Sequence, residues 1–370
     1  MSRYFAVSVI AVSLVLAFAG IASAQETKYP DILDAKPMYK AGPNHMELAP
    51  KAPAASLTQW NGSYTDLTKK KITYTQIGTD PTSTNTSTTI TAYIIPVKMV
   101  YPPSNGNATF DPKTHVLSNG KTVVKNIIAS PIFNPGLDFT QGGTDLGTTQ
   151  YIDAFQRGNF WSTVSSESSY HVLLSTKPKV LAEKTIKVTN PNLGGVFNNP
   201  FGSGIIGTYD INAFDNEIQI WIKALKQINP GVLPIFITYD IYLTSGGCCI
   251  GGYHNANGPQ PSGQTYAMAT YEDSPGSFSQ DVSALSHEIG EWLDDPFVDN
   301  FVNCNDNGIM EVGDPLEGEA NYGGYPYTLG GFTYNLQSLV FIGYFGAPAS
   351  TSVHSWLSFQ NDEKHVCPGQ

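Results

Sequence analysis

The sequence predicts an α+β fold, in which a β-rich N-terminal part precedes a mixed sheet with a backing helix and a second helix rich in His and Glu. Runs of β-branched and aromatic residues at 72–101, 233–243 and 264–271 are typical of strands. Apolar residues recur at helical spacing over 210–229, and a Pro-Gly pair follows them, which indicates an amphipathic helix.

The composition indicates a globular chain with one large or two moderate domains. Its 370 residues are 41% hydrophobic, with 20 Tyr and 18 Phe, enough to bury a sizeable core. The net charge is -11 and no dense run of Lys and Arg occurs, which argues against nucleic acid and anionic membrane surfaces as partners. The charged fraction of 14%, with abundant Gly and Pro, is typical of a secreted, loop-rich protein.

The first 24 residues have the pattern of a signal peptide. Arg3 precedes an apolar stretch at 5–21, and small residues at 22–24 provide a cleavage site. We therefore expect a mature chain that begins at Gln25, is secreted or periplasmic, and has no membrane attachment after cleavage. An uncleaved membrane anchor is the alternative.

The rest of the chain divides into three predicted regions. Residues 25–60 are proline-rich and lack periodicity, as expected of an extended lead-in or pro-segment. Residues 61–140 form a β-rich region, and residues 141–370 form the domain that carries the candidate site. The boundary rests on a change of composition near 135–145.

Four cysteines are available for disulfides in an exported chain: Cys248, Cys249, Cys304 and Cys367. A bond between neighbours is strained, so we expect at least one of the first two to reach Cys304 or Cys367. The absence of a C-x-x-C pair argues against a tetrathiolate zinc site.

The predicted second helix contains the run His-Glu-Ile-Gly-Glu at 287–291, and Pro296 ends it. His287 and Glu291 lie one turn apart on one helix face. The helix of zinc peptidases is similar, with His-Glu-x-x-His supplying two histidine ligands and a glutamate that activates water. In this chain Glu291 stands at the last position.

A hydrolytic metal ion needs about three protein ligands and an open position for water. His287 and Glu291 supply two, and either Glu311 or Asp314 supplies the third, while the other orients His287. Glu288 is the candidate base that takes a proton from metal-bound water. Two carboxylates and one imidazole suit Zn²⁺, and they also admit Mn²⁺, Fe²⁺ or Ca²⁺.

Two further features lie near this set. His254 falls in a predicted glycine-rich loop at 246–254, where it can polarise a substrate carbonyl as a catalytic residue or add a ligand; an exposed loop histidine is the alternative. Asparagines and a glycine at 303–308, followed by Asp314, have the register of a calcium loop. A glycine-turned asparagine loop is the simpler interpretation.

The order of these motifs resembles that of the EXORDIUM-like (phosphate-induced) secreted proteins and their bacterial relatives. The likeness runs from about residue 233 to the C-terminus and rests on His-Glu-Ile-x-Glu at 287–291, Asp-Pro at 295–296, Glu-Val-Gly-Asp at 311–314, Glu-Gly at 317–318 and Gly-Phe-Thr-Tyr-Asn at 331–335. That family commonly has Cys after the Glu-Val-Gly-Asp element, where this chain has Pro315. The strand, helix, strand, strand, helix order looks like a zincin catalytic core, which implies a zincin-like mixed sheet.

Together these features predict an exported metal-binding protein, with Zn²⁺ or another divalent ion as cofactor. We expect a zincin-like metallohydrolase that acts on peptide bonds of an extracellular polypeptide, with Glu288 activating metal-bound water. The alternative is a non-catalytic secreted or cell-surface protein with a structural metal site.

Overall fold

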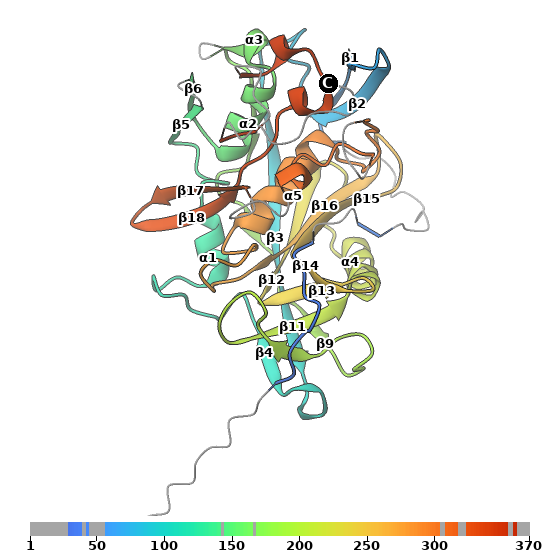
Figure 1. Cartoon of the computed structure of the whole chain (residues 1–370), viewed down its shortest axis with the longest axis vertical. Helices are drawn as coiled ribbons and strands as arrows, with labels where there is room; N and C mark the ends of the chain where they lie inside the picture. Colours follow the sequence, from blue (N-terminus) through green and yellow to red (C-terminus); the bar gives the residue numbers. More distant parts are fainter. Residues whose placement is uncertain are drawn as a thin grey trace, which may run out of the picture.

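The computed structural model describes residues 29–38, 42–43, 56–141, 144–165, 168–303, 308–316, 323–353 and 358–360. These residues form a mixed α and β structure in which strands predominate, so the predicted β-rich α+β class is confirmed (Figure 1). The predicted signal peptide, Cys304 and Cys367 lie outside the described residues.

Among the described residues, eight strands form the main sheet, which is mixed. β12 is parallel to β3 and to β16, whereas β15 is antiparallel to β16 at the sheet edge. Both β12 and β16 are buried along their whole length, as expected of strands covered on both faces. The path of the sheet is β15 (Gly252–Asn257), β16 (Gln264–Tyr271), β12 (Val232–Tyr239), β3 (Ser87–Tyr101) and β4 (Ala108–Phe110), while β7 (His171–Leu174), β8 (Lys179–Val180) and β9 (Lys184–Lys187) also pair with β3.

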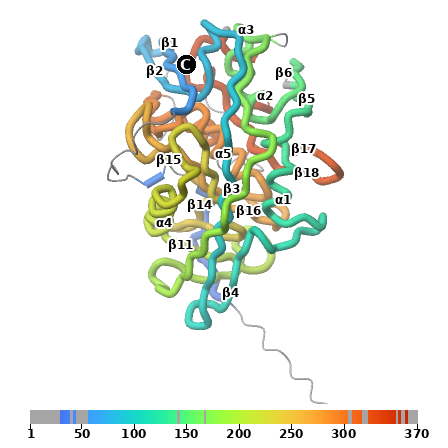
Figure 2. The backbone as a smooth tube through the Cα atoms, turned by 180° about the vertical axis from the view of Figure 1, so that it is seen from behind, coloured from blue at the N-terminus to red at the C-terminus, as the bar shows by residue number. Residues whose placement is uncertain are grey.

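β3 is the long central strand, and it joins the two predicted regions. Figure 2 shows it running through much of the height of the molecule. Ile94 is registered with Ile235 of β12, so regions 61–140 and 141–370 contribute to one sheet. The boundary near residue 140 therefore does not separate one sheet from another.

A second sheet lies beside the first and contains β10 (Val196–Asn198), β11 (Ile205–Asp210), β13 (Ile241–Thr244) and β14 (Cys248–Ile250). The single strand expected at 233–243 is wrong, because the chain turns at Asp240, whose φ is 50°. β12 and β13 consequently belong to different sheets. In the described ranges, three two-stranded pairs also occur: β1–β2 (Gln59–Thr65, Lys71–Ile77), β5–β6 (Leu137–Gln141, Thr144–Thr149) and β17–β18 (Gly324–Leu329, Phe332–Gln337).

The helices confirm the main periodicity predictions. The helix expected at 210–229 is α4 (Ile211–Ala224), whose first turn is capped by the Asp210 carboxylate accepting from the backbone N–H of Ala213. The other α-helices are α1 (Val123–Ile128), α2 (Tyr151–Asn159), α3 (Trp161–Val164) and α5 (Ser283–Asp294), and short 3₁₀ turns occur at Pro103–Asn105, Asp314–Leu316, Ile342–Phe345 and Ala349–Thr351.

α5 is the predicted His/Glu helix, and every residue in it is buried. It packs against β15, β16 and β18. The backbone N–H of Gln337 on β18 donates to the Ser286 hydroxyl at 2.7 Å, which ties the helix to that hairpin. The residue before the helix is Val282, and its side chain makes no capping hydrogen bond.

The glycine-rich loop expected at 246–254 is also wrong, since this segment supplies β14 and β15. Cys248 and Cys249 form a disulfide with each other, so the expected bond to a distant cysteine is not present for this pair. Both cysteines lie on β14, which pairs with β13 on one side and with residues 36–38 on the other. Figure 1 shows these lead-in residues in blue beside β14.

Candidate metal centre

Three elements bring the predicted site residues together. α5 contributes His287, Glu288 and Glu291, while the antiparallel edge strand β15 contributes His254. Glu311 and Asp314 come from the segment that leads into the 3₁₀ turn at Asp314–Leu316. Five of these six side chains are buried, and Asp314 is partly buried.

His254 Nδ1 faces three carboxylates. Its distances to the nearest oxygens of Glu288, Glu291 and Glu311 are 3.6, 3.7 and 3.9 Å, too long for hydrogen bonds. Within the described part of the chain, His254 Nδ1 and both carboxylate oxygens of Glu288 and Glu311 have no hydrogen-bond partner. Buried polar atoms without partners are destabilising, so this arrangement indicates a place for a cation.

Three of these residues place ligand atoms close enough to share one ion. One atom each from His254, Glu288 and Glu291 lies within 4.8 Å of the others. Glu311 joins this set through its oxygen 3.9 Å from His254 Nδ1. We call His254, Glu288, Glu291 and Glu311 the His254 cluster.

The second ring nitrogen of His254 fixes the orientation of the ring. Nε2 lies 2.9 Å from the backbone oxygen of Asp295, and because a carbonyl only accepts, Nε2 carries the proton. In the neutral ring Nδ1 is then a bare lone pair aimed at the carboxylates. A metal-binding histidine is typically held in this way, with its other nitrogen donating to a carbonyl or carboxylate.

Glu291 connects the His254 cluster to the other two residues. Its Oε1 lies 3.1 Å from His287 Nε2 and accepts from the backbone N–H of Gly313 at 3.2 Å. Its Oε2 is the oxygen that faces His254. Asp314 Oδ1 lies 3.6 Å from His287 Nε2, so His287, Glu291 and Asp314 form a second group with metal-binding side chains.

The predicted ligands thus form two groups, one near each carboxylate oxygen of Glu291. Glu311 lies with His254, whereas Asp314 lies with His287. The alternative of an exposed loop histidine at His254 is wrong, because that side chain is buried in a strand. The calcium-loop alternative falls on residues 303–314, of which 304–307 lie outside the described residues.

The electrostatics of the cluster favour positive charge. Burial raises the pKa of Glu288 to about 7, and burial together with Glu291 raises the pKa of Glu311 well above its usual range. Burial acts in the same direction on Glu291, but His287 and His254 outweigh it and lower the pKa of that carboxyl. Burial lowers the pKa of His254, but Glu311 and its neighbours outweigh burial and raise it well above its usual range. The same negative potential attracts a metal ion, which competes with protons.

Close packing behind the cluster holds its side chains in place. A Cβ on Gly252 of β15 would lie 2.7 Å from Glu288 Cγ, and one on Gly313 would lie 2.0 Å from His287 Nδ1. Only glycine permits these approaches. The indole N–H of Trp292 donates to Thr265 at 2.9 Å and so ties α5 to β16.

A hydrogen-bonded anchor fixes the edge strand from its other side. The hydroxyls of Tyr253 on β15 and Tyr266 on β16 both donate to Asp215 on α4, at 2.9 and 2.6 Å. Because Tyr253 precedes His254, this anchor limits movement of the strand that carries the imidazole.

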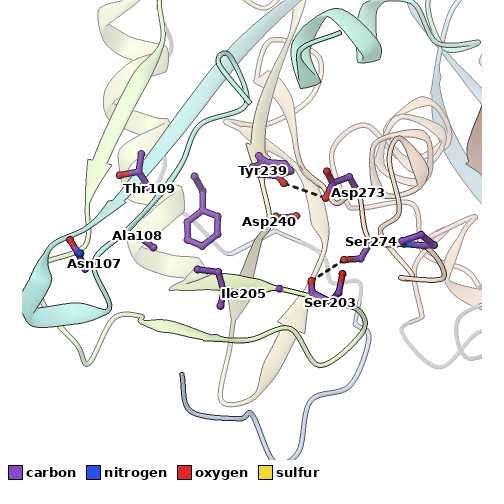
Figure 3. A pocket seen from close by; sticks show the side chains of 12 residues that line it. Asn107, Ala108, Thr109, Ser203, Ile205, Tyr239, Asp240, Asp273 and Ser274 are labelled. Atoms are coloured by element: carbon purple, nitrogen blue, oxygen red, sulfur yellow. Dashed lines mark hydrogen bonds between the residues drawn. The ribbon is translucent and has the colours of Figure 1, made fainter. Parts of the chain in front are cut away.

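A separate cavity of about 610 Å³ lies where β12 and β16 end (Figure 3). Tyr239, Asp240 and Asp273 line it, and the Tyr239 hydroxyl donates to Asp273 at 3.2 Å. None of the six predicted site residues lines this cavity. Burial, Glu272 and Asp273 raise the pKa of Asp240 to about 8.

No helix in the described ranges is both long and apolar enough to cross a membrane. Comparisons with models of known protein families, with curated proteins and with solved structures found no match. The resemblance to EXORDIUM-like proteins and to zincins therefore stays a prediction from the motifs.

Proposed function

We propose that this chain binds a divalent metal ion through the His254 cluster. The observation that carries the proposal is the set of buried Glu288 and Glu311 oxygens that have no hydrogen-bond partner among the described residues and that surround His254 Nδ1. Leaving such charges uncompensated destabilises a folded chain by several kcal/mol, on the order of 3–5 for a broken buried pair. One imidazole and three carboxylates suit Zn²⁺, and also harder ions such as Mn²⁺ or Ca²⁺.

In this proposal His287 is a positioning residue for Glu291. Its contact with Oε1, together with the Gly313 N–H, directs Oε2 toward the ion. Asp314 in turn lies beside His287, as a second carboxylate commonly does next to a histidine near a metal. The group of His287, Glu291 and Asp314 is the competing location for the ion.

A closed shell of four protein ligands is typical of a structural metal site. The buried cluster therefore supports the non-catalytic alternative, a secreted or cell-surface protein whose ion ties α5, β15 and the Glu311 segment together. Export is supported by the signal-peptide pattern at 1–24, which lies outside the described residues.

The second candidate is a zincin-like metallohydrolase acting on a polypeptide. It is favoured by the site helix α5 packed against a mixed sheet whose antiparallel edge strand carries His254, with α4 as the backing helix. In this case His254, Glu291 and Glu311 would hold the ion, which when bound would activate a water molecule, and Glu288 would accept the proton.

Metal titration of the metal-free full chain tests the metal centre. We expect about one tightly bound Zn²⁺ per chain in the wild type and a loss of affinity of about 100-fold or more in Glu311→Gln. The matched control is Glu272→Gln, a buried glutamate outside the cluster that accepts from the Tyr242 hydroxyl. Equal affinity in Glu311→Gln and wild type would refute the ligand assignment.

Glu288→Gln separates the two candidate functions. If Glu288 is a ligand in a structural site, the variant binds Zn²⁺ more weakly and the wild type hydrolyses no peptide library. If Glu288 is the base, the variant keeps its metal and loses hydrolysis that the wild type shows, by a factor of about 10² to 10⁴.

A further inference from the structure

Residues of the proline-rich lead-in pair with the outer edge of β14 and β15. Lys36 and Met38 run parallel to β14 and exchange three backbone hydrogen bonds with it and one with Gly251. Their N–H groups donate to Cys248 and Cys249 at 2.8 Å, and they accept from Cys249 and Gly251 at 2.6 and 3.3 Å.

Gly42 and Pro43, which are described separately from residues 36–38, lie beside the candidate metal ligand. The backbone N–H of Gly42 donates to the backbone oxygen of His254 at 3.2 Å. One residue on, the Asn255 side chain donates to the backbone oxygen of Pro43 at 2.8 Å. An extended piece of chain therefore lies directly against the residue that carries the imidazole.

Most of this attachment uses backbone atoms, which every peptide has. Leu33 is 92% exposed, and Met38 is only partly buried against the core. Adding an extended segment to an open sheet edge in this way is a common mode of peptide recognition, in which backbone bonds provide affinity and a few side chains provide selectivity.

One position in the segment is selective. A Cβ on Gly42 would lie 2.4 Å from Asn255 Nδ2 and 2.6 Å from Asn255 Cβ. Because Asn255 is itself buried and bonded to Pro43, it has little room to move. The position beside His254 thus requires glycine.

We propose that the β14–β15 edge is a docking site for an extended peptide with glycine opposite His254, and that residues 36–38 and 42–43 are its built-in occupant. Releasing this segment opens the edge to another peptide of the same kind. Residues 29–31 remain bonded to Asn198, which keeps the released segment close to the edge as a competitor. The proposal goes beyond the metal centre and does not require a bound ion.

Hydrogen exchange of the backbone amides tests it in the full chain. Met38→Pro removes one donor to the edge, and Gly42→Val introduces the clash with Asn255; the two are combined in one variant. We expect the Cys249 and Gly251 amides to exchange at least about tenfold faster in this variant than in the wild type. Leu33→Pro, in the same lead-in at an exposed position, is the matched control and leaves their exchange unchanged.

A synthetic peptide with the sequence of residues 36–43 is then added at about 1 mM, a concentration that detects weak docking. It should restore slow exchange in the double variant, while the same peptide carrying Gly42→Val should not. Unchanged exchange in the double variant, or no restoration by the peptide, would overturn the proposal. Gly42→Val alone repeats the test if the double variant folds poorly, and a failed metal titration leaves this result unaffected.

Discussion

His254 is the residue on which the proposed metal centre depends, because its Nδ1 faces Glu288, Glu291 and Glu311 together. Its Nε2–H is held by the Asp295 carbonyl, so the ring cannot turn away without losing that bond. A substitution here removes a ligand and leaves three carboxylates in a buried space.

We therefore predict that His254→Ala lowers Zn²⁺ affinity by about 100-fold or more, measured by competition with a coloured chelator. The control His115→Ala removes a half-exposed histidine that pairs with Asp273 in the other cavity. Loss of affinity in His115→Ala, with His254→Ala unaffected, would move the site away from α5.

Asp240 provides a pH test at a distance from the cluster. Its pKa is raised from 3.8 to about 8, first by burial and then by Glu272 and Asp273. Between pH 3.8 and about 8 the Asp240 carboxyl is therefore protonated in the folded chain and ionised in the unfolded chain. The free energy of unfolding consequently falls as the pH rises through this window.

We predict that Asp240→Asn stabilises the protein at pH values above about 8, on the order of 2 kcal/mol, and has much less effect near pH 4. Asparagine tolerates the positive φ of this position. Urea unfolding at both pH values measures the difference. An equal difference in free energy of unfolding between Asp240→Asn and wild type at both pH values would contradict the raised pKa of Asp240.

The sequence predicted that these candidate residues lie near one another, but it did not predict how they group. The turn of helix between His287 and Glu291 predicted a shared face, and these residues are in contact. Which of Glu311 and Asp314 lies with His254 depends on a segment without periodic structure, so no local pattern determines it. His254 was assigned to a loop because the glycines around it disfavour strands.

At the scale of elements, the contact between β15 and α5 sets the shape of the cluster. Gly252 allows the Glu288 side chain to lie against the strand, where a Cβ would also approach the Met268 carbonyl at 2.9 Å. The strand therefore cannot carry a side chain here without displacing a proposed ligand.

We predict that Gly252→Ala lowers the free energy of unfolding by about 1–3 kcal/mol and weakens metal binding, although alanine is stiffer than glycine in the unfolded chain. Gly247→Ala is the matched control, because a Cβ there meets no atom within 4 Å. Chemical denaturation and metal titration of both variants check the prediction. Equal behaviour of the two would show that the β15–α5 contact is not tight.

Helices and strands with strong periodicity were predicted from the sequence. Strands that depend on pairing with distant segments were missed. α4 and β16 follow from local pattern alone. The run at 246–254 became strand because β13, β16, Lys36, Met38 and Gly42 pair with it. Asp210 caps α4, whereas α5 starts without a polar cap.

At the scale of the whole molecule, a metal ion would join parts that are distant in sequence. The His254 cluster draws on β15, α5 and the Glu311 segment, and β3 places the N-terminal region in the same sheet. Pairing between residues so far apart leaves no local trace in the sequence, which is why the shared sheet was not predicted.

We predict that removing the metal with a chelator destabilises the folded chain, because an ion that binds only the folded state stabilises it by about 2.7 kcal/mol at a hundredfold excess over Kd. Thermal unfolding with and without added Zn²⁺ measures the effect. Glu311→Gln should show a much smaller difference than the wild type. An identical response of both proteins to the chelator would contradict the proposed coupling.

The location of the ion is tested most directly by anomalous X-ray diffraction from crystals of the zinc-loaded protein, recorded above and below the zinc edge. We predict one strong peak about 2.0–2.4 Å from His254 Nδ1 and from carboxylate oxygens of Glu291 and Glu311. A zinc-loaded crystal with no peak there, or with its peak between His287 and Asp314, would contradict it.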